Sequence, residues 1–403
     1  MKKPTVISLF SGAGGLDYGF EAAGFDTRVV LEMDPDACRT LSANRPKWTL
    51  IPRDIHSVPS EEILEKARLK KEEATLLIGG PPCQPFSKAG YWSRGDSLRL
   101  DDPRANTLAA YLRVLEDTLP ECFVLENVEG MAYRNKDEGL QLLLDAINAI
   151  NKRTGANYRP KPVVMNAADY GVPQLRKRLI IVGTRTGETL TFQRTHGEGP
   201  GLERFRTAWD ALADVGPGPD EDLEVRGKWA KLLPSIPEGH NYLWHTDRMD
   251  GKPLFGWRRR YWSFLLKLAK AQPSWTIQAQ PGPAIGPFHW ENRRLSMREV
   301  CRIQTFPDDV KVLGSRLAIQ KQVGNAVPSL LGEVLGRGIR QQMLKETVAG
   351  KPRLLPPVRR STPKPEKTSR VPSEFLVLQG SHAPHAGTGL GPAALRRDAG
   401  AKR

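Results

Sequence analysis

The sequence of 403 residues contains few cysteines and no long apolar run. Its four cysteines, Cys38, Cys83, Cys122 and Cys301, form no CxxC pair, which argues against a disulfide scaffold and against a zinc site. No stretch approaches the roughly eighteen apolar residues that a membrane helix needs, and residues 1–15 lack the apolar core and cleavage site of a secretory signal. We therefore expect no metal, no membrane partner and a reducing compartment, the cytoplasm.

Acidic residues are scarce relative to basic ones. The chain has 60 Lys and Arg against 45 Asp and Glu, a formal net charge of +15, whereas its 39% apolar and 26% charged residues are ordinary for a folded protein. A chain of this length accommodates two to three domains with sizeable cores. The excess of positive charge indicates a polyanionic partner, and nucleic acid is the first candidate.

Much of this charge lies near the C-terminus. Residues 351–403 contain 11 Lys and Arg against 3 Asp and Glu, together with eight prolines. Their composition predicts a basic, Pro-rich tail from residue 349 onward that is mostly disordered. Composition leaves two interpretations open: a solubilising extension, or a basic arm that adds non-specific affinity for phosphates.

A second basic segment, residues 225–270, has 10 Lys and Arg against 3 acids and follows an acidic loop at 214–224. Six of the nine tryptophans lie between Trp229 and Trp290. Basic residues interleaved with aromatics, as in FGWRRRYW at 255–262, can contact phosphates and stack on bases. Alternatively, the aromatics form a small core beneath a solvated basic face, and this segment alone leaves both interpretations open.

The first 185 residues alternate short apolar runs with helical stretches, for example the expected helices at 61–71 and 138–150. The apolar runs lie at 6–10, 29–31, 76–78, 122–125 and 179–182. This rhythm is typical of a doubly wound, mostly parallel α/β sheet of the Rossmann-like type. Residues 190–290 are rich in Gly, Pro and Trp and predict an irregular second domain, after which helical patterning returns at 296–303.

Glycines follow the first expected strand, in FSGAGG at 10–15, just before a helix that starts near Leu16. Glycine lets backbone N–H groups and a helix N-terminus approach a ligand closely. Glu32 ends the second strand, where an acid can hydrogen-bond ribose hydroxyls, and Asp54 lies where the third strand should end and could accept from an adenine amino group. Together these features predict a nucleoside cofactor without fixing which one.

A displayed cysteine follows the strand at 76–78, in GGPPCQPFS. Two prolines restrict the backbone before Cys83, so its thiol stands at the tip of a rigid loop, where nucleophiles are held. Glu126 follows the next strand at the same edge of the sheet, and a protonated Glu there could face a ring nitrogen. Arg176 and Arg178 alternate before a further strand and would point to one face.

Eight motifs in order make the chain resemble the DNA (cytosine-5) methyltransferases of the bacterial modification-enzyme type. They are FSGAGG at 10–15, Glu32, Asp54, GGPPCQPFS at 79–87, ENV at 126–128, QLRKR at 174–178, RRLSMREVCRIQTFPDD at 293–309 and QVGNAVP at 322–328. The resemblance implies four parts: a catalytic and cofactor-binding α/β domain at 1–185, a target-recognition domain at 186–292, C-terminal motifs at 293–348 that return to the catalytic domain, and the tail at 349–403.

The resemblance implies S-adenosyl-L-methionine as the methyl donor. Phe10 should stack on the adenine, Glu32 should bind the ribose and Asp54 the adenine amino group. The full set of implied cofactor-binding residues is Phe10, Ser11, Gly12, Ala13, Gly14, Gly15, Glu32, Met33, Asp54, Ile55, Gly80, Pro82, Leu108, Asn325, Ala326 and Val327. Since Asn325 belongs to the last motif, the helix after it should pack back against the first strand.

The resemblance also implies a mechanism. The Cys83 thiolate adds to C6 of cytosine and makes C5 nucleophilic enough to attack the sulfonium methyl group. Glu126 assists at N3, and Arg176 binds the pyrimidine carbonyl. The complete set of implied catalytic residues is Cys83, Glu126, Arg176, Arg178 and Gln174. Because this chemistry does not fit inside a stacked duplex, the target base must be flipped out.

The implied DNA contacts come from two segments. Residues 87–104 should close over the DNA, with contacts from Ser87 and Arg94, and the recognition segment should contribute the side chains of Trp257, Arg258, Arg259 and Arg260. We expect a monomer that acts on double-stranded DNA in the bacterial cytoplasm, at the nucleoid. A restriction endonuclease is the expected functional partner, without a physical complex.

Two positions depart from the family pattern. Ser8 stands where the family usually has Asp, two residues before Phe10. That acid normally helps to hold the methionine end of the cofactor, whereas serine can hydrogen-bond but carries no charge. Arg53 replaces the small residue often found before Asp54.

Two other functions compete with this one. A tRNA-methylating branch of the family shares the catalytic motifs but has little recognition domain, whereas here about 110 residues separate QLRKR from Arg293. A catalytically dead DNA-binding regulator is disfavoured by the intact Cys83, Glu126 and Arg176. The sequence therefore favours a sequence-specific DNA methyltransferase.

Overall fold

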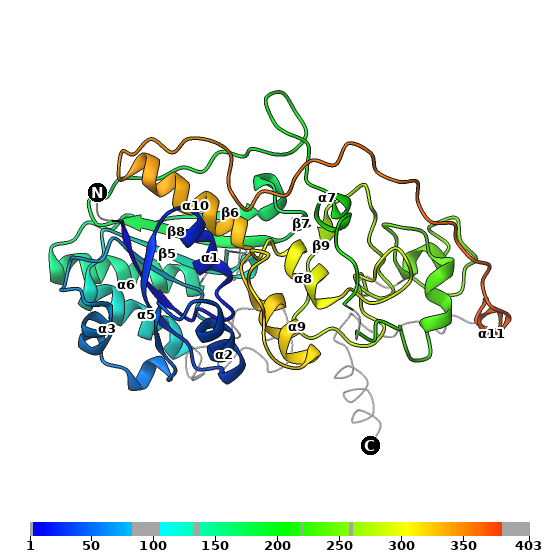
Figure 1. The fold of residues 1–403 in the computed structure, drawn as a ribbon, viewed down its shortest axis with the longest axis horizontal. Coiled ribbons are helices and arrows are strands. Elements are labelled where there is room, and N and C mark those ends of the chain that lie inside the picture. The colour runs from blue at the N-terminus through cyan, green and yellow to red at the C-terminus, as the bar shows by residue number, and fades with distance from the viewer. Residues whose placement is uncertain (1–2, 83–104, 133–137, 219–220, 258–260, 381–403) are drawn as a thin grey trace, which may run out of the picture.

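The computed structural model describes residues 3–82, 105–132, 138–218, 221–257 and 261–380 (Figure 1). Several predicted site residues lie outside these ranges, namely Cys83, Ser87, Arg94, Arg258, Arg259 and Arg260. Their roles remain predictions.

Seven strands form one sheet in the order β3-β2-β1-β4-β5-β8-β6. Their bounds are β1 (Thr5–Leu9), β2 (Asp26–Leu31), β3 (Thr49–Ile51), β4 (Leu76–Gly79), β5 (Cys122–Val128), β6 (Lys161–Asn166) and β8 (Lys177–Thr184). Strands β1 to β5 pair in parallel, and β8 runs antiparallel to both of its neighbours. The predicted doubly wound, mostly parallel fold is confirmed.

Helices cover both faces of this sheet, which is why its inner strands are continuously apolar. All five residues of β1 and all four of β4 are buried. The helices are α1 (Gly15–Ala22), α2 (Pro35–Asn44), α3 (Ser60–Ala67), α5 (Ala105–Thr118), α6 (Glu138–Thr154) and α10 (Ser329–Gln342). One core packs α3, α5 and α6 on one face, and a second core packs α1 and α10 on the other.

Helix α10 lies against α1 at a glycine contact. A Cβ atom at Gly19 would stand 2.2 Å from the carbonyl oxygen of Ser329, and one at Gly332 would stand 2.8 Å from the carbonyl oxygen of Leu16. Leu331 of α10 and Val6 of β1 share one core. The chain after the last motif therefore returns to the first strand, as predicted.

The other half of the molecule has little regular structure. Its elements are β7 (Gln174–Leu175), which pairs in parallel with β9 (Ser274–Trp275), the helices α7 (Ala208–Leu212), α8 (Met297–Ile303) and α9 (Arg316–Asn325), and 3-10 turns at Ala230–Ser235 and Tyr242–His245. Aromatic side chains make a core there. The ring centre of Trp229 lies 5.3 to 5.8 Å from the ring centres of Phe255, Phe264 and Phe375.

Disorder of the tail at 349–403 remains a prediction, and within that tail residues 349–380 contact the rest of the chain. This segment, called the strap below, runs from the end of α10 along the irregular half to a short helix, α11 (Ser373–Leu376), at the far end of the molecule (Figure 1). Phe375 is only 4% exposed and stacks on Trp229. Prolines keep the strap extended, while buried acids accept hydrogen bonds from its backbone.

The four-part division at 185, 292 and 348 remains a prediction. Within the residues that the structure covers, none of the helices combines the length and hydrophobicity needed to cross a lipid bilayer.

Candidate active site

The glycine-rich loop between β1 and α1 has a backbone that few residues can adopt. Phe10, Gly12 and Gly14 have φ angles of 56°, 54° and 85°. At Gly15 a side chain has no room, since a Cβ atom would stand 2.4 Å from the carbonyl oxygen of Val327. The first and the last motifs of the chain are thus in direct contact, although about three hundred residues separate them in sequence.

Glu32 holds this loop in place. One carboxylate oxygen accepts a hydrogen bond from the backbone of Gly12 at 2.7 Å, and the other accepts from the backbones of Met33 and Asp34, both at 2.8 Å. A carboxylate has about four acceptor positions, so room remains for a further donor. The predicted ribose-binding acid therefore also shapes the loop beside it.

Asp54 ends the segment after β3 and is about half exposed. It accepts hydrogen bonds from the backbone and the ring of His56, at 3.0 and 2.7 Å, and these bonds lower the pKa of its carboxyl group. Ile55 beside it is buried, whereas Met33 is 63% exposed. Glu32 follows the carboxyl end of β2 and Asp54 follows that of β3, as predicted.

A cavity of about 120 Å³ lies at this edge of the sheet. Its lining includes nine of the predicted residues, namely Phe10, Ser11, Gly12, Gly15, Gly80, Glu126, Asn325, Ala326 and Val327. Ala13, Gly14, Glu32, Met33, Asp54, Ile55, Pro82 and Leu108 do not line it. Six further lining residues were not predicted to bind the cofactor: Ser8, Leu9, Leu16, Asp17, Gly79 and Gln322.

Glu126 stands at the floor of this cavity. Its carboxylate accepts an ion-paired hydrogen bond from Nε of Arg178 at 2.8 Å, and a Cβ atom at Gly80 would stand 2.9 Å from its second oxygen. Burial raises the pKa of Glu126, while Arg178 and Arg176 oppose that shift. A raised pKa makes this carboxyl group easier to protonate, and in its protonated form it can donate to a ring nitrogen.

Arg176 and Arg178 do not share a role. The Arg176 side chain is 1% exposed, and its guanidinium donates to the backbone carbonyls of Ile277 and Gly324 at 3.2 and 2.8 Å. Burial and the neighbouring Arg178 hold the pKa of Arg176 well below its usual range. The residue in contact with Glu126 is Arg178, although the sequence had pointed to Arg176 as the group that meets the base.

The side chain of Gln174 is buried and makes hydrogen bonds within the protein interior. Its amide donates to Gln304 at 2.8 Å and accepts from the backbone of Ile277 at 2.9 Å. Gln304 in turn donates to the carbonyl of Val323 at 2.6 Å. Gln174 thus joins three motifs, and its side chain is fully buried and does not line the cavity; its catalytic role remains a prediction.

The family model for C-5 cytosine-specific DNA methylases matches residues 4–341. The chain belongs to the C-5 cytosine-specific DNA methylase family. The predicted family and the predicted enzyme class are thereby confirmed.

Two relatives with more than 30% sequence identity are named Type II methyltransferases. M.SacI of Streptomyces achromogenes is 41% identical over 369 residues, which cover 84% of this chain and 93% of that protein. M1.HphI of Haemophilus parahaemolyticus is 32% identical over 350 residues, which cover 85% of this chain and 88% of that protein.

Solved structures at low identity share the fold. A putative DNA modification methyltransferase encoded within an Escherichia coli prophage superposes with a TM-score of 0.59 at 23% identity, covering 85% of this chain and all of that one. A DNMT2 from Spodoptera frugiperda gives 0.59 at 16% identity, covering 84% of this chain and 99% of that one.

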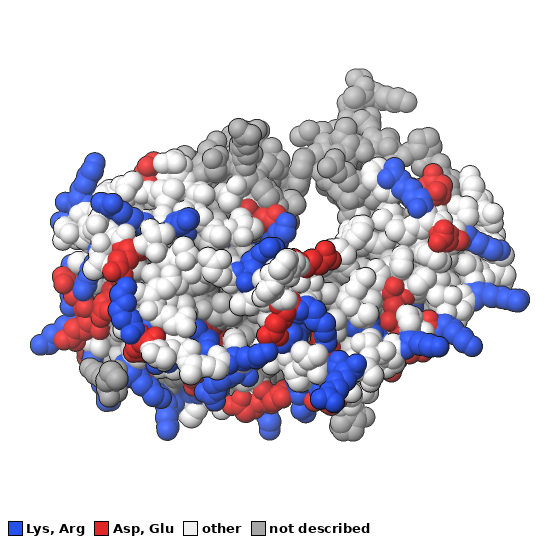
Figure 2. Space-filling view, turned by 90° about the horizontal axis from the view of Figure 1, so that it is seen from above, with Lys and Arg blue, Asp and Glu red and all other residues white. Residues whose placement is uncertain are grey.

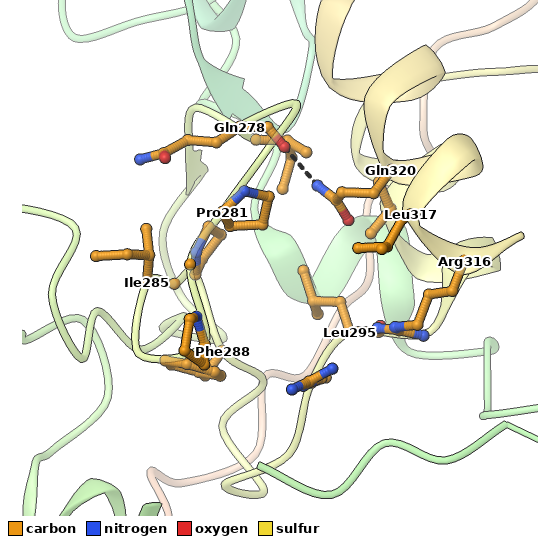
Figure 3. A pocket seen from close by; sticks show the side chains of 15 residues that line it. Gln278, Pro281, Ile285, Phe288, Leu295, Arg316, Leu317 and Gln320 are labelled. Atoms are coloured by element: carbon orange, nitrogen blue, oxygen red, sulfur yellow. Dashed lines mark hydrogen bonds between the residues drawn. The ribbon is translucent and has the colours of Figure 1, made fainter. Parts of the chain in front are cut away.

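A second cavity, of about 270 Å³, lies where the loop after β9 meets α9 (Figure 3). Its wall is mostly apolar, with Arg316 and Gln320 on the helix side and Phe288 on the loop side (Figure 3). Gln320 donates to the backbone of Gln278 across it. In this methyltransferase the loop is thus tied to the helix that carries Asn325 into the first cavity.

The described surface carries charged side chains of both signs and exposed aromatic rings. Figure 2 shows Lys and Arg side chains at both ends of the molecule, interspersed with Asp and Glu. Trp257 is 42% exposed, and the guanidinium of Arg248 lies 3.8 Å from the centre of its ring. Trp262 is 46% exposed. The aromatics of this segment therefore divide between a core around Trp229 and exposed rings.

Proposed function

We propose that the protein is a modification methyltransferase that transfers a methyl group from S-adenosyl-L-methionine to C5 of a cytosine within a specific sequence of duplex DNA. One observation carries this proposal: the carboxylate of Glu126, only 12% exposed and ion-paired to Arg178, lines a cavity together with the glycine loop and Gly80. Glu126 lies in β5, and Gly80 directly follows the neighbouring parallel strand β4, so this acid stands beside the segment that leads to Cys83.

The residues around the cavity fit S-adenosylmethionine. The glycine loop offers a wall without side chains, and a fully buried carboxylate, that of Asp17, faces the space without a hydrogen-bond partner in the described chain. Phe10, Ser11, Gly12, Gly80 and the segment 325–327 would hold the methionine portion, with Glu32 and Asp54 on the nucleoside side. When bound, this group supplies an electrophilic methyl on a positively charged sulfur.

The chain's own residues then act on the cytosine. The Cys83 thiolate forms a bond to C6 and converts C5 into an enamine-like nucleophile, and loss of the C5 proton later lets the thiolate leave. Glu126 would share a proton with N3 as charge develops there, and burial, which raises the pKa of this carboxyl group, favours that sharing. Arg178 fixes the orientation of Glu126 and takes the place beside the base that the sequence had assigned to Arg176.

The target base has to leave the helix for this chemistry. Residues 87–104, including Ser87 and Arg94, would close over the DNA, and Trp257 with Arg258–Arg260 would contact its groove or phosphates. The names of the relatives support a modification role paired with a restriction endonuclease. A monomer in the bacterial cytoplasm completes the proposal.

Transfer of labelled methyl groups tests this function. The purified protein should label duplex DNA and leave tRNA unlabelled, and it should form a covalent complex with a duplex that carries 5-fluorocytosine, from which the thiolate cannot leave. Cys83→Ala should lose both, whereas Cys301→Ala, a cysteine remote from the cavity lining, should keep both. Labelling of tRNA in preference to DNA would contradict the proposal.

A further inference from the structure

Asp17 is a buried acid that the mechanism above does not use. It is the third residue of α1, it is 0% exposed, and it lines the cavity beside Ser8 and the glycine loop. Neither of its carboxylate oxygens accepts a hydrogen bond of good geometry from the described residues, although the Ser8 hydroxyl lies close enough to act on the acid. An acid at this helix position commonly caps its own helix, but α1 has no side-chain cap.

The charges that act on Asp17 increase its need for a cation. Glu32 and Glu21 both repel it, and Arg45, which would offset the charge of Glu21, is already paired with that residue. Two orphaned acceptor atoms in a buried site are costly unless a donor reaches them. The space in front of Asp17 is therefore complementary to a positively charged group with several N–H donors.

The strand end beside Asp17 carries no charge. It holds Ser8, the hydroxyl of which bonds to Ser11 at 2.8 Å. Ser8 and Asp17 line the same cavity from two adjoining elements. The negative charge on this side of the cavity is therefore supplied by the first turn of α1 and not by the strand end.

We propose that Asp17 binds the α-ammonium group of S-adenosylmethionine. This inference rests on the proposed function. An ammonium has three N–H donors and can satisfy both orphaned oxygens, whereas the sulfonium has none. Glu126 lines this cavity while Glu32 and Asp54 do not, which places Asp17 at the methionine end and away from the nucleoside.

The protonation of Asp17 provides an independent readout. Burial raises the pKa of Asp17 to about 7, against the lowering effect of Ser8. A cation bound against the carboxylate favours its charged form and lowers that pKa. The binding of an ammonium-bearing ligand near pH 6.5 should therefore release a proton from the protein.

Calorimetric titration of the full-length protein tests the inference with two probes. S-adenosylhomocysteine carries the ammonium, and 5′-methylthioadenosine has the same nucleoside and thioether without the amino-acid end. Asp17→Asn should weaken S-adenosylhomocysteine binding roughly 10- to 100-fold, the range expected for a lost charged hydrogen bond, and leave methylthioadenosine binding unchanged. Glu21→Gln, on the same helix and outside the cavity lining, should change neither.

A second variant and a measurement on the wild-type protein distinguish a lost ammonium contact from misfolding of Asp17→Asn. Ser8→Asp combined with Asp17→Asn moves the acid to the strand end and should restore most of the lost affinity. In the wild-type protein, titration at pH 6.5 in buffers of different ionisation heat should show proton release with S-adenosylhomocysteine and none with methylthioadenosine.

Three results would overturn the inference: equal affinity of wild type and Asp17→Asn for S-adenosylhomocysteine, an equal loss for both ligands, or no difference in proton release between them. If the wild-type protein bound neither S-adenosylmethionine nor S-adenosylhomocysteine, the proposed function itself would fail.

Discussion

In the catalytic half, the polar groups of the backbone are satisfied by seven paired strands, and the helices press apolar faces onto that sheet. The half around residues 190–290 has one pair of two-residue strands in the described chain, and there side chains do much of the bonding. Lys267 donates to the backbone of Ile236, and Ser235 bonds to His245 at 2.8 Å.

Ion pairs inside the irregular half show the same dependence on side chains. Lys270 is paired with Glu238, at 4% and 5% exposure, and also with Glu366 of the strap at 2.9 Å. Asp210 is 0% exposed and accepts from Arg204 and from the backbone of Arg359, which belongs to the strap. Loss of a single polar side chain should therefore destabilise the irregular half more than the sheet.

The strap should be the largest contributor to this difference. A protein ending at Gly350 loses Phe375 from its core and leaves Asp210 and Glu333 without strap donors, so we expect it to lose about 5 kcal/mol or more of stability. A protein ending at Gly380 keeps all of these contacts. Thermal unfolding and limited proteolysis of both should show early cleavage within 190–290 only for the shorter one, and equal stability of the two would contradict the strap's role.

A single buried ion pair should have the next largest effect. Lys270→Met leaves Glu238 buried without its main partner, which should lower the free energy of unfolding by about 3–5 kcal/mol in urea titrations. Lys231→Met removes an exposed pair with Glu374, at 76% and 50% exposure, and should change it by less than about 1 kcal/mol. Similar losses in the two variants would show that burial of the pair is unimportant.

Overpacking tests the catalytic half in the same terms. Gly19→Ala places a Cβ atom 2.2 Å from the carbonyl oxygen of Ser329, so α1 and α10 must separate at a cost of about 1–3 kcal/mol. Gly216→Ala meets nothing within 4 Å and should be neutral. Because α10 follows Asn325, cofactor affinity should fall together with stability. A loss of stability at unchanged affinity would show that the packing of α10 does not affect the cofactor site.

Acid should weaken the irregular half through its buried histidines. Burial lowers the pKa of His289 to about 3 and that of His196 to about 4. Below pH 6.5 these histidines become protonated in the unfolded chain but stay neutral in the folded protein. The free energy of unfolding therefore falls by on the order of 1–3 kcal/mol as the pH drops from about 6.5 to 4. His289→Gln should flatten that slope, and an unchanged slope would assign it to other groups.

Much of the catalytic half could be predicted because its information is local. Strands β1, β2, β4, β5 and β8 coincide with apolar runs, and α3, α6 and α8 lie close to the helical stretches seen in the sequence. Motif residues such as Phe10 and Glu126 line the predicted cavity.

The rest depends on contacts between distant residues. Nothing local separates Arg176 from Arg178, and only the carbonyls of Ile277 and Gly324 show which guanidinium is tied up in the interior. The strap has the composition of a disordered tail, and its order comes from acceptors more than a hundred residues away. Asp17 could have been noticed as an acid directly after the glycine turn, but its orphaned oxygens appear only in three dimensions.

The central claim is that Cys83 and Glu126 methylate cytosine at C5 in a specific DNA sequence. Single-base mapping of 5-methylcytosine in DNA from cells that express the wild-type protein or Cys83→Ala tests it most directly. The account predicts 5-methylcytosine at one short recurrent sequence with the wild type and none with Cys83→Ala. An unmethylated genome with the wild type, or the same methylated sequence with the variant, would contradict it.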